Sequence, residues 1–261
     1  VFDPAKVIVE GTKRGVSFIG ETVSNRKSVF DESIIKGLHG TVMYYLPGIA
    51  GQYRLGEDVR IGNSRLISGD QLRNKMHLFG RWLRQETESL RDRPEDLLGA
   101  LRLACEAHYG LVSPQLHPFD DGNGRVARLL ANGILMLNAH ELVFYRIKIL
   151  PIPLVRQSAK GRDDPYIQIL GEIDQTRVIN PLEIYMASLW SVNLKQMIDS
   201  YSEKVSGHGK KTDSDQRLID KFRIRAAILD EFIANQMKKN GQAELHVVPD
   251  YFALQHLKNK T

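Results

Sequence analysis

The stretch His117-Pro118-Phe119-Asp120-Asp121-Gly122-Asn123-Gly124-Arg125-Val126-Ala127-Arg128 gathers a histidine, two acidic residues, two glycines and two arginines. Gly122 and Gly124 permit positive φ and a close approach of the backbone to a ligand. A glycine turn that leads into a helix exposes the unpaired N–H groups of the first helical turn, at the positive end of the helix dipole. The stretch therefore predicts an anion-binding loop followed by a helix over residues 124–138.

The charged residues of this stretch indicate which anion it binds. Arg125 and Arg128 lie three residues apart on the opening turns of the helix, so both guanidinium groups can reach one anion. Together with a nest of N–H groups, they suit a di- or triphosphate better than a carboxylate. Asp121 is adjacent, where Mg²⁺ bound to phosphates would find a protein oxygen. His117 can accept a proton at neutral pH, and Phe119 is expected to anchor the loop in the core.

Each of these features also has an ordinary explanation. A lone histidine before a helix is usually structural, a lone Gly-Asn-Gly is only a turn, and helical arginines usually face solvent. Their concentration in one short stretch favours the phosphate-binding interpretation. The motifs of a P-loop, a Gly-x-Ser-x-Gly nucleophile and a His-Glu-x-x-His zinc site are absent from the sequence.

Around this loop the sequence is mostly helical in pattern. Helices are predicted over 29–46, 70–89, 94–113, 180–201 and 215–239, and a hairpin with a Gly62-Asn63 turn over 57–70. Residues 1–28 are mixed, with β-prone runs such as 7–9, and residues 139–179 are irregular or weakly helical. The predicted divisions are an N-terminal segment (1–28), a catalytic domain (29–201), a polar linker (202–214) and a C-terminal helical appendage (215–261).

Composition narrows the class of protein. The 261 residues are 42% hydrophobic and carry a formal net charge of +5, with basic residues scattered among acidic ones, so nucleic-acid binding is not expected. No apolar run approaches the ~20 residues that span a bilayer, so no membrane partner is expected. The single cysteine, Cys105, excludes a disulfide within the chain. No signal peptide is visible, and the expected location is the cytoplasm, or wherever a secretion system delivers the protein.

The stretch 117–128 resembles the signature of the Fic-domain family, H-P-F-x-[D/E]-G-N-G-R-x-x-R, at every fixed position. Upstream, Gly51-Gln52-Tyr53-Arg54 resembles the family's G-x-[Y/F]-R segment. The residues that follow resemble its target-docking hairpin, the flap: Val59, Arg60, Ile61, Gly62, Asn63, Ser64, Arg65 and Leu66. The resemblance implies a mainly α fold, a Fic-type helical bundle with a short β-hairpin flap and a small C-terminal helical appendage.

The resemblance also implies an activity, the transfer of AMP from ATP to a Tyr, Thr or Ser hydroxyl of a target protein, with release of pyrophosphate. His117 would deprotonate the hydroxyl and Asp121 would hold Mg²⁺. The phosphates would be bound by the loop residues Phe119, Gly122, Asn123 and Gly124 and by the arginines Arg125 and Arg128. Two alternatives stay open: a Fic-fold transferase with another nucleotide or phospho-donor, and a nucleotide-sensing or DNA-binding regulator that uses residues 215–261.

Many members of this family carry an inhibitory helix with the pattern [S/T]-x-x-x-E-[G/N], whose glutamate pairs with the second arginine of the signature. Two segments come close, one ending in Glu10-Gly11 and the other in Glu21-Thr22. Because β-branched residues and glycine dominate both, neither is predicted to be helical. The expectation is therefore no built-in inhibitory glutamate, with control by a separate small partner protein or by none.

Overall fold

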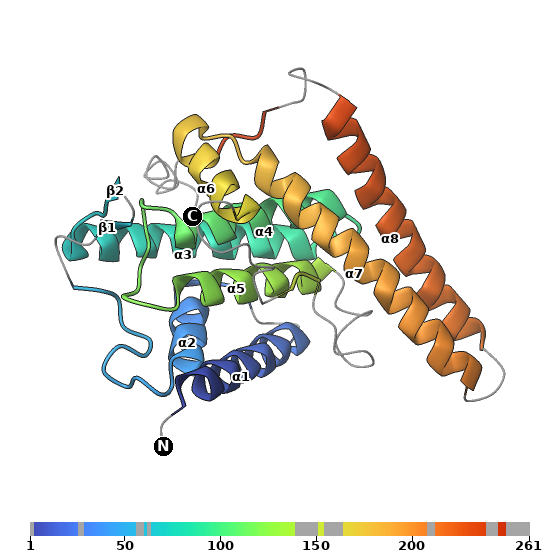
Figure 1. Ribbon diagram of the computed structural model, residues 1–261, viewed down its shortest axis with the longest axis horizontal. Coiled ribbons are helices and arrows are strands. Elements are labelled where there is room, and N and C mark those ends of the chain that lie inside the picture. Colours follow the sequence, from blue (N-terminus) through green and yellow to red (C-terminus); the bar gives the residue numbers. More distant parts are fainter. Residues whose placement is uncertain are drawn as a thin grey trace.

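The computed structural model describes residues 3–25, 29–55, 60–61, 64–138, 151–153, 164–207, 212–238 and 245–248. These residues form a mainly helical structure (Figure 1). Its elements are α1 (Pro4–Ser24), α2 (Glu32–Val42), β1 (Arg60–Ile61), β2 (Ser64–Arg65), α3 (Gly69–Arg91), α4 (Leu97–Val112), α5 (Asn123–Asn138), α6 (Pro165–Thr176), α7 (Asn180–Gly207) and α8 (Asp213–Lys238). Of the helices described, none is both long and apolar enough to span a bilayer.

Helix α5 is the centre of the core. It packs against α1, α2, α3 and α4. Its side chains from Val126 onward are almost all buried, including the positions predicted to face the core: Ala127, Leu130, Ala131, Ile134 and Leu135. A helix surrounded in this way has little freedom to shift, because protein interiors are close-packed. The first residues of α5, which belong to the predicted anion loop, are therefore held in a fixed place.

Residues 4–24 form the helix α1, so the prediction of an irregular, β-prone N-terminal segment was wrong. Asp3 caps this helix by accepting hydrogen bonds from the first-turn N–H groups, and Pro4 stands at its first position. Its glycines have a packing role. A Cβ at Gly11 would lie 2.1 Å from the carbonyl oxygen of Val42, and one at Gly15 would lie 2.6 Å from the Leu129 side chain. Close packing on α2 and α5 therefore outweighs the weak helix propensity of the sequence.

Several other boundaries differ from the predicted ones. Ser68, rather than Asp70, caps α3, and α4 begins after Asp96 rather than at Pro94. Helix α6 lies within the stretch predicted to be irregular or weakly helical. Helix α7 continues to Gly207, into the stretch predicted as a linker, of which residues 208–211 lie outside the described residues.

The C-terminal part of the chain returns to the helical core. Helix α8 packs along α7. Beyond it, Val247 forms an antiparallel bridge with Val178, which lies just before α7. The Nδ1 atom of His246 lies 2.7 Å from a carboxylate oxygen of the buried Glu183, which also pairs with Arg102 at 3.5 Å. These contacts tie residues 245–248 to α4 and α7.

The predicted hairpin region contains two short strands that lead into α3. Strands β1 and β2 are antiparallel, with Arg60 opposite Arg65 and Ile61 opposite Ser64. Figure 1 shows them beside the start of α3. The predicted Gly62-Asn63 turn lies outside the described residues.

The packing of α1 on α2 can be tested through its glycine. We expect Gly11→Ala to lower the free energy of unfolding by about 1–3 kcal/mol, because the new methyl group would overlap the Val42 carbonyl and force the helices apart. Urea denaturation measures the change. The matched control is Gly171→Ala in α6, where a Cβ meets nothing within 4 Å, and stability should stay equal or rise slightly. Equal stability of the two variants would contradict this packing.

Candidate active site

The predicted anion loop connects α4 to α5 and has an unusual backbone at both ends. His117 has φ 38° and Gly122 has φ 84°. At Gly122 space is tight as well, since a Cβ would lie 3.0 Å from Met43 Sδ. A left-handed conformation is unfavourable for histidine, so the surroundings of His117 must hold it there.

Arg54 supplies that restraint. Its side chain is only 1% exposed, and its Nε donates a 2.8 Å hydrogen bond to the carbonyl oxygen of His117. Its Nη2 lies 3.4 Å from the carbonyl oxygen of Leu116. The backbone N–H of Arg54 donates to the carbonyl oxygen of Pro118 at 3.0 Å. One buried residue therefore binds three consecutive peptide groups of the loop, two through its guanidinium group and one through its backbone N–H. This is the arginine of the Gly51–Arg54 segment, 63 residues away from His117 in the sequence.

Asn123 closes the loop from within. Its Oδ1 accepts the backbone N–H of Phe119 at 3.0 Å, and its Nδ2 donates to the Phe119 carbonyl at 2.7 Å. Both the oxygen and the nitrogen of this side-chain amide are therefore used inside the loop. What Asn123 can still offer a ligand is its backbone N–H.

Phe119 is buried, as its anchoring role requires, and its ring stacks on His39 with centroids 3.7 Å apart. His39 in turn braces the loop from α2. Its Nδ1 accepts the Gly51 N–H at 2.9 Å, so its Nε2 carries the proton and donates to the Asp121 carbonyl at 3.0 Å. Burial lowers the pKa of His39, in keeping with this neutral form. The sequence carries no signal of this role, because a buried histidine in a helix is usually only a satisfied core residue.

Helix α5 begins without a side-chain cap. Six other helices of the described residues have one, provided by Asp3, Asp31, Ser68, Asp96, Asp164 and Thr212. Gly122 occupies the capping position of α5 and has no side chain. The N–H groups of Asn123, Gly124 and Arg125 therefore remain at the positive end of the helix dipole, where an anion can accept their hydrogen bonds.

Both arginines of the stretch lie at this end of α5. The guanidinium group of Arg125 donates to Asp121 Oδ2 and to the Tyr45 hydroxyl, each at 2.9 Å. Arg128 lies close enough to the fully buried His108 to act on its pKa. Burial first, and then the charge of Arg128, lower the pKa of His108 to about 3, so that this ring stays neutral. The site therefore concentrates positive charge around the exposed N–H groups.

His117 stands at the entrance of the loop in a form that can accept a proton. Its Nδ1 lies 3.2 Å from the carbonyl oxygen of Val112. Because a carbonyl can only accept, Nδ1 carries the hydrogen and Nε2 keeps its lone pair. The pKa of His117 is lowered, mainly by burial and further by the charge of Arg54, against the opposing hydrogen bond to Val112. The imidazole is therefore neutral at neutral pH.

The acidic residues of the site fit a metal ion that arrives with a ligand. The side chain of Asp121 is 63% exposed, and its Oδ1 accepts the Gly122 N–H at 2.5 Å. Within the described residues, no three His, Cys, Asp or Glu side chains come together as a metal site. One exposed carboxylate suits Mg²⁺, which takes most of its ligands from phosphate and water.

The structure describes only part of the predicted flap. Among the flap residues, Arg60, Ile61, Ser64 and Arg65 form the strands, while Leu66 is buried and so does not face a docking partner. Val59, Gly62 and Asn63 lie outside the described residues.

Both candidate inhibitory glutamates lie in α1, so the expectation that their segments are not helical was wrong. The carboxylate of Glu10 pairs with Arg14 at 3.1 Å, one turn further along the same helix. Control by a separate small partner stays a prediction.

Comparison with known proteins identifies the domain that carries this site. Residues 29–135 match the model of the Fic/DOC family. The chain is 28% identical over 215 residues to a Protein adenylyltransferase Fic of Nematostella vectensis, covering 77% of this chain and 47% of that protein. It is 31% identical over 126 residues to one of Drosophila melanogaster, covering 48% of this chain and 24% of that protein. The chain thus spans about half the length of these curated relatives, or less.

A solved structure agrees in fold. A Fic domain containing signaling protein from Bacteroides thetaiotaomicron superposes with a TM-score of 0.54 at 19% identity, over 77% of this chain and 73% of that one. The family match covers α2 to α5 and the whole loop. Residues 29–135 of this chain, which carry the site, are therefore similar to the Fic/DOC family.

Proposed function

We propose that this protein transfers AMP from ATP to a Ser, Thr or Tyr hydroxyl of another protein. The observation that carries the proposal is the proximity, in one loop, of an imidazole with a free Nε2 lone pair and an uncapped helix N-terminus flanked by two arginines. The first is a general base and the second is a polyphosphate site. The relatives named Protein adenylyltransferase Fic support the same reaction.

The chemistry follows from these parts. The phosphates of ATP lie at the start of α5, where the N–H groups of residues 123–125, Arg125 and Arg128 balance their charge. His117 Nε2 takes the proton of the target hydroxyl, and the oxygen attacks the α-phosphorus. The bond from the α-phosphorus to the bridging oxygen breaks, and pyrophosphate leaves. Mg²⁺ held by Asp121 would supply further charge neutralisation on the phosphates.

Binding of ATP requires a rearrangement of one ion pair. In the structure Arg125 is held by Asp121 and Tyr45. If Asp121 held Mg²⁺ in place of Arg125, the guanidinium group of Arg125 could turn to the phosphates. Every charge would then still have a partner. The pair therefore keeps both groups at the site before the nucleotide arrives.

The role of His117 predicts a pH profile and a loss of function. Because the neutral imidazole is the base and its pKa lies below the usual 6.5, the rate should stay level at neutral pH and fall only as the pH drops through that lowered pKa. We expect His117→Ala to reduce transfer by about 10²–10⁴-fold while ATP still binds. Transfer of label from ATP labelled at the α-phosphate measures the first quantity and calorimetry the second. A variant with more than half the wild-type rate would refute the assignment.

Gly124 tests the phosphate site without disturbing the fold. A Cβ at Gly124 would meet only the flexible end of Arg128, at 3.4 Å, so Gly124→Ala should fold with unchanged stability. Next to the exposed N–H groups, the methyl group should obstruct the phosphates and weaken ATP binding by at least about tenfold. The matched control is Gly171→Ala, at an open position on α6. ATP affinities that agree within a factor of two would exclude this location for the phosphates.

The flap offers the target a backbone edge. We propose that an extended target segment adds to the strand pair β1–β2, which requires no particular target sequence. A proline lacks the N–H that such pairing uses, so Ile61→Pro or Arg65→Pro should slow target modification by about tenfold or more and leave ATP binding intact. Quantitative labelling of the target in a cell lysate measures the change. Unaltered labelling by both variants would argue against docking at the flap.

A further inference from the structure

A row of basic side chains runs along α3, the helix that follows the flap. Arg73, His77, Arg81 and Arg84 are all exposed and are spaced three or four residues apart. This spacing places them on one face of the helix. We call them the α3 stripe.

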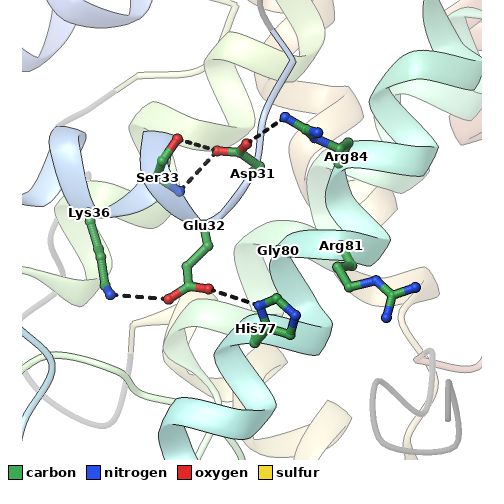
Figure 2. Close-up of a pocket in the computed structure, with 8 residues that line it drawn as sticks. All are labelled: Asp31, Glu32, Ser33, Lys36, His77, Gly80, Arg81 and Arg84. Atoms are coloured by element: carbon green, nitrogen blue, oxygen red, sulfur yellow. Dashed lines mark hydrogen bonds and ion pairs between the residues drawn. The ribbon is translucent and has the colours of Figure 1, made fainter. Parts of the chain in front are cut away.

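The stripe ends in a pocket of about 400 Å³ between α3 and the start of α2. Figure 2 shows the residues that line it: Asp31, Glu32, Ser33 and Lys36 from α2, and His77, Gly80, Arg81 and Arg84 from α3. Gly80 brings the two helices together, since a Cβ there would lie 2.7 Å from the backbone nitrogen of Glu32. The pocket is therefore formed by tightly packed helices.

The acidic groups of the pocket are already engaged. Asp31 accepts hydrogen bonds from the first turn of α2 and pairs with Arg84 at 3.1 Å. Glu32 accepts the Tyr53 hydroxyl at 3.0 Å and pairs with Lys36 at 3.1 Å. Figure 2 shows both ion pairs.

The arginines of the stripe keep positive charge to spare. Arg81 has no acidic partner in the part of the chain that the structure describes. Arg73 has only a weak one, Asp70 at 3.8 Å, with both side chains highly exposed. The charge that remains for a ligand is therefore positive.

The other end of the stripe lies beside the active-site loop. The first residue of α3, Gly69, is packed so closely on the chain that a Cβ would lie 3.2 Å from the Leu55 carbonyl oxygen and 3.4 Å from that of Arg54. Arg54 is the residue that holds His117. From Gly69 to Arg81 the helix extends about 18 Å, a length that about five or six residues of an extended chain cover.

We propose that the α3 stripe and its pocket bind an acidic segment of the target protein. Given the length of α3 between the flap and Arg81, this segment lies within about ten residues of the modified hydroxyl. The proposal rests on the proposed function, because a target placed at the flap can reach the stripe by continuing along α3. A short acidic peptide segment suits this surface, because Asp31 and Glu32 interrupt its positive charge. A nucleic acid or an anionic membrane would instead favour a continuous basic face.

The test uses the full chain and fluorescent peptides. Each peptide contains one threonine and a run of four glutamates that lies six to nine residues before or after it. Peptides with glutamine in place of glutamate are the neutral control. Fluorescence anisotropy reads binding without any transfer. We expect Arg73→Glu with Arg81→Glu to weaken binding of the glutamate peptides by about tenfold or more, and wild-type binding to weaken with added salt. The matched control reverses the charges of two arginines on α8, with Arg217→Glu and Arg223→Glu. Like Arg73, Arg223 has a weak acidic partner, Asp220 at 3.4 Å.

The outcomes separate the two proposals. Loss of glutamate-peptide binding in the α3 variant, but not in the α8 variant, supports the stripe even if no AMP is transferred. Equal binding by both variants, or equal binding of glutamate and glutamine peptides, overturns it. Binding of a labelled duplex DNA or of phosphatidylserine vesicles that depends on Arg73 and Arg81, where the glutamate peptides fail, also overturns it. Unfolding midpoints within about 2 °C of the wild type establish that both variants are folded.

Discussion

The buried guanidinium group of Arg54 is the contact on which the active-site loop depends. This group lies against the carbonyl oxygens of Leu116 and His117. The backbone N–H of Arg54 donates to the carbonyl oxygen of Pro118. A charge taken out of water is costly unless hydrogen bonds satisfy it, and these carbonyls do so. In return, His117 is kept in a left-handed conformation that an unrestrained histidine would leave. The position of His117, the proposed general base, thus follows from a cation more than sixty residues earlier in the chain.

The same loop gives up stabilisation at its other end. Helix α5 is the most enclosed helix of the core, yet Gly122 leaves its N-terminus without the side-chain cap that its four neighbours α1, α2, α3 and α4 possess. A missing cap typically costs about 1 kcal/mol. Asn123 and His39 offset part of this by bracing the loop backbone from inside. An uncapped N-terminus on an immobile helix is a prepared binding site for an anion, because its N–H groups need no rearrangement to meet a phosphate.

From the sequence alone, the loop could be interpreted more fully than the residues that surround it. The residues from His117 to Arg128 could be interpreted because glycine, arginine and histidine have few uses in that spacing. The partners of the loop were harder to foresee. His39 has no sequence feature that sets it apart from a core histidine, and Asn123 could have faced either the ligand or the loop. Only the fold shows that its amide is turned inward.

Helix α1 shows why propensity misled at the N-terminus. Gly11 and Gly15 lower the intrinsic preference for helix, and the same two residues allow α1 to pack closely on Val42 and Leu129. The gain from that packing depends on α2 and α5, which lie outside any local window of sequence. The extension of α7 to Gly207 likewise has a tertiary partner, because α8 packs along this helix.

We have proposed that this loop activates the α-phosphorus of ATP for attack by a hydroxyl. The most direct measurement is the mass of the modified product, after parallel incubations with ATP labelled at the α- or at the γ-phosphate. The structure predicts that the target gains one AMP, that only the α-label stays with it, and that the γ-label appears in pyrophosphate. A target that gains one phosphate and keeps the γ-label would contradict this account, because the nucleophile would then have attacked the other end of the triphosphate.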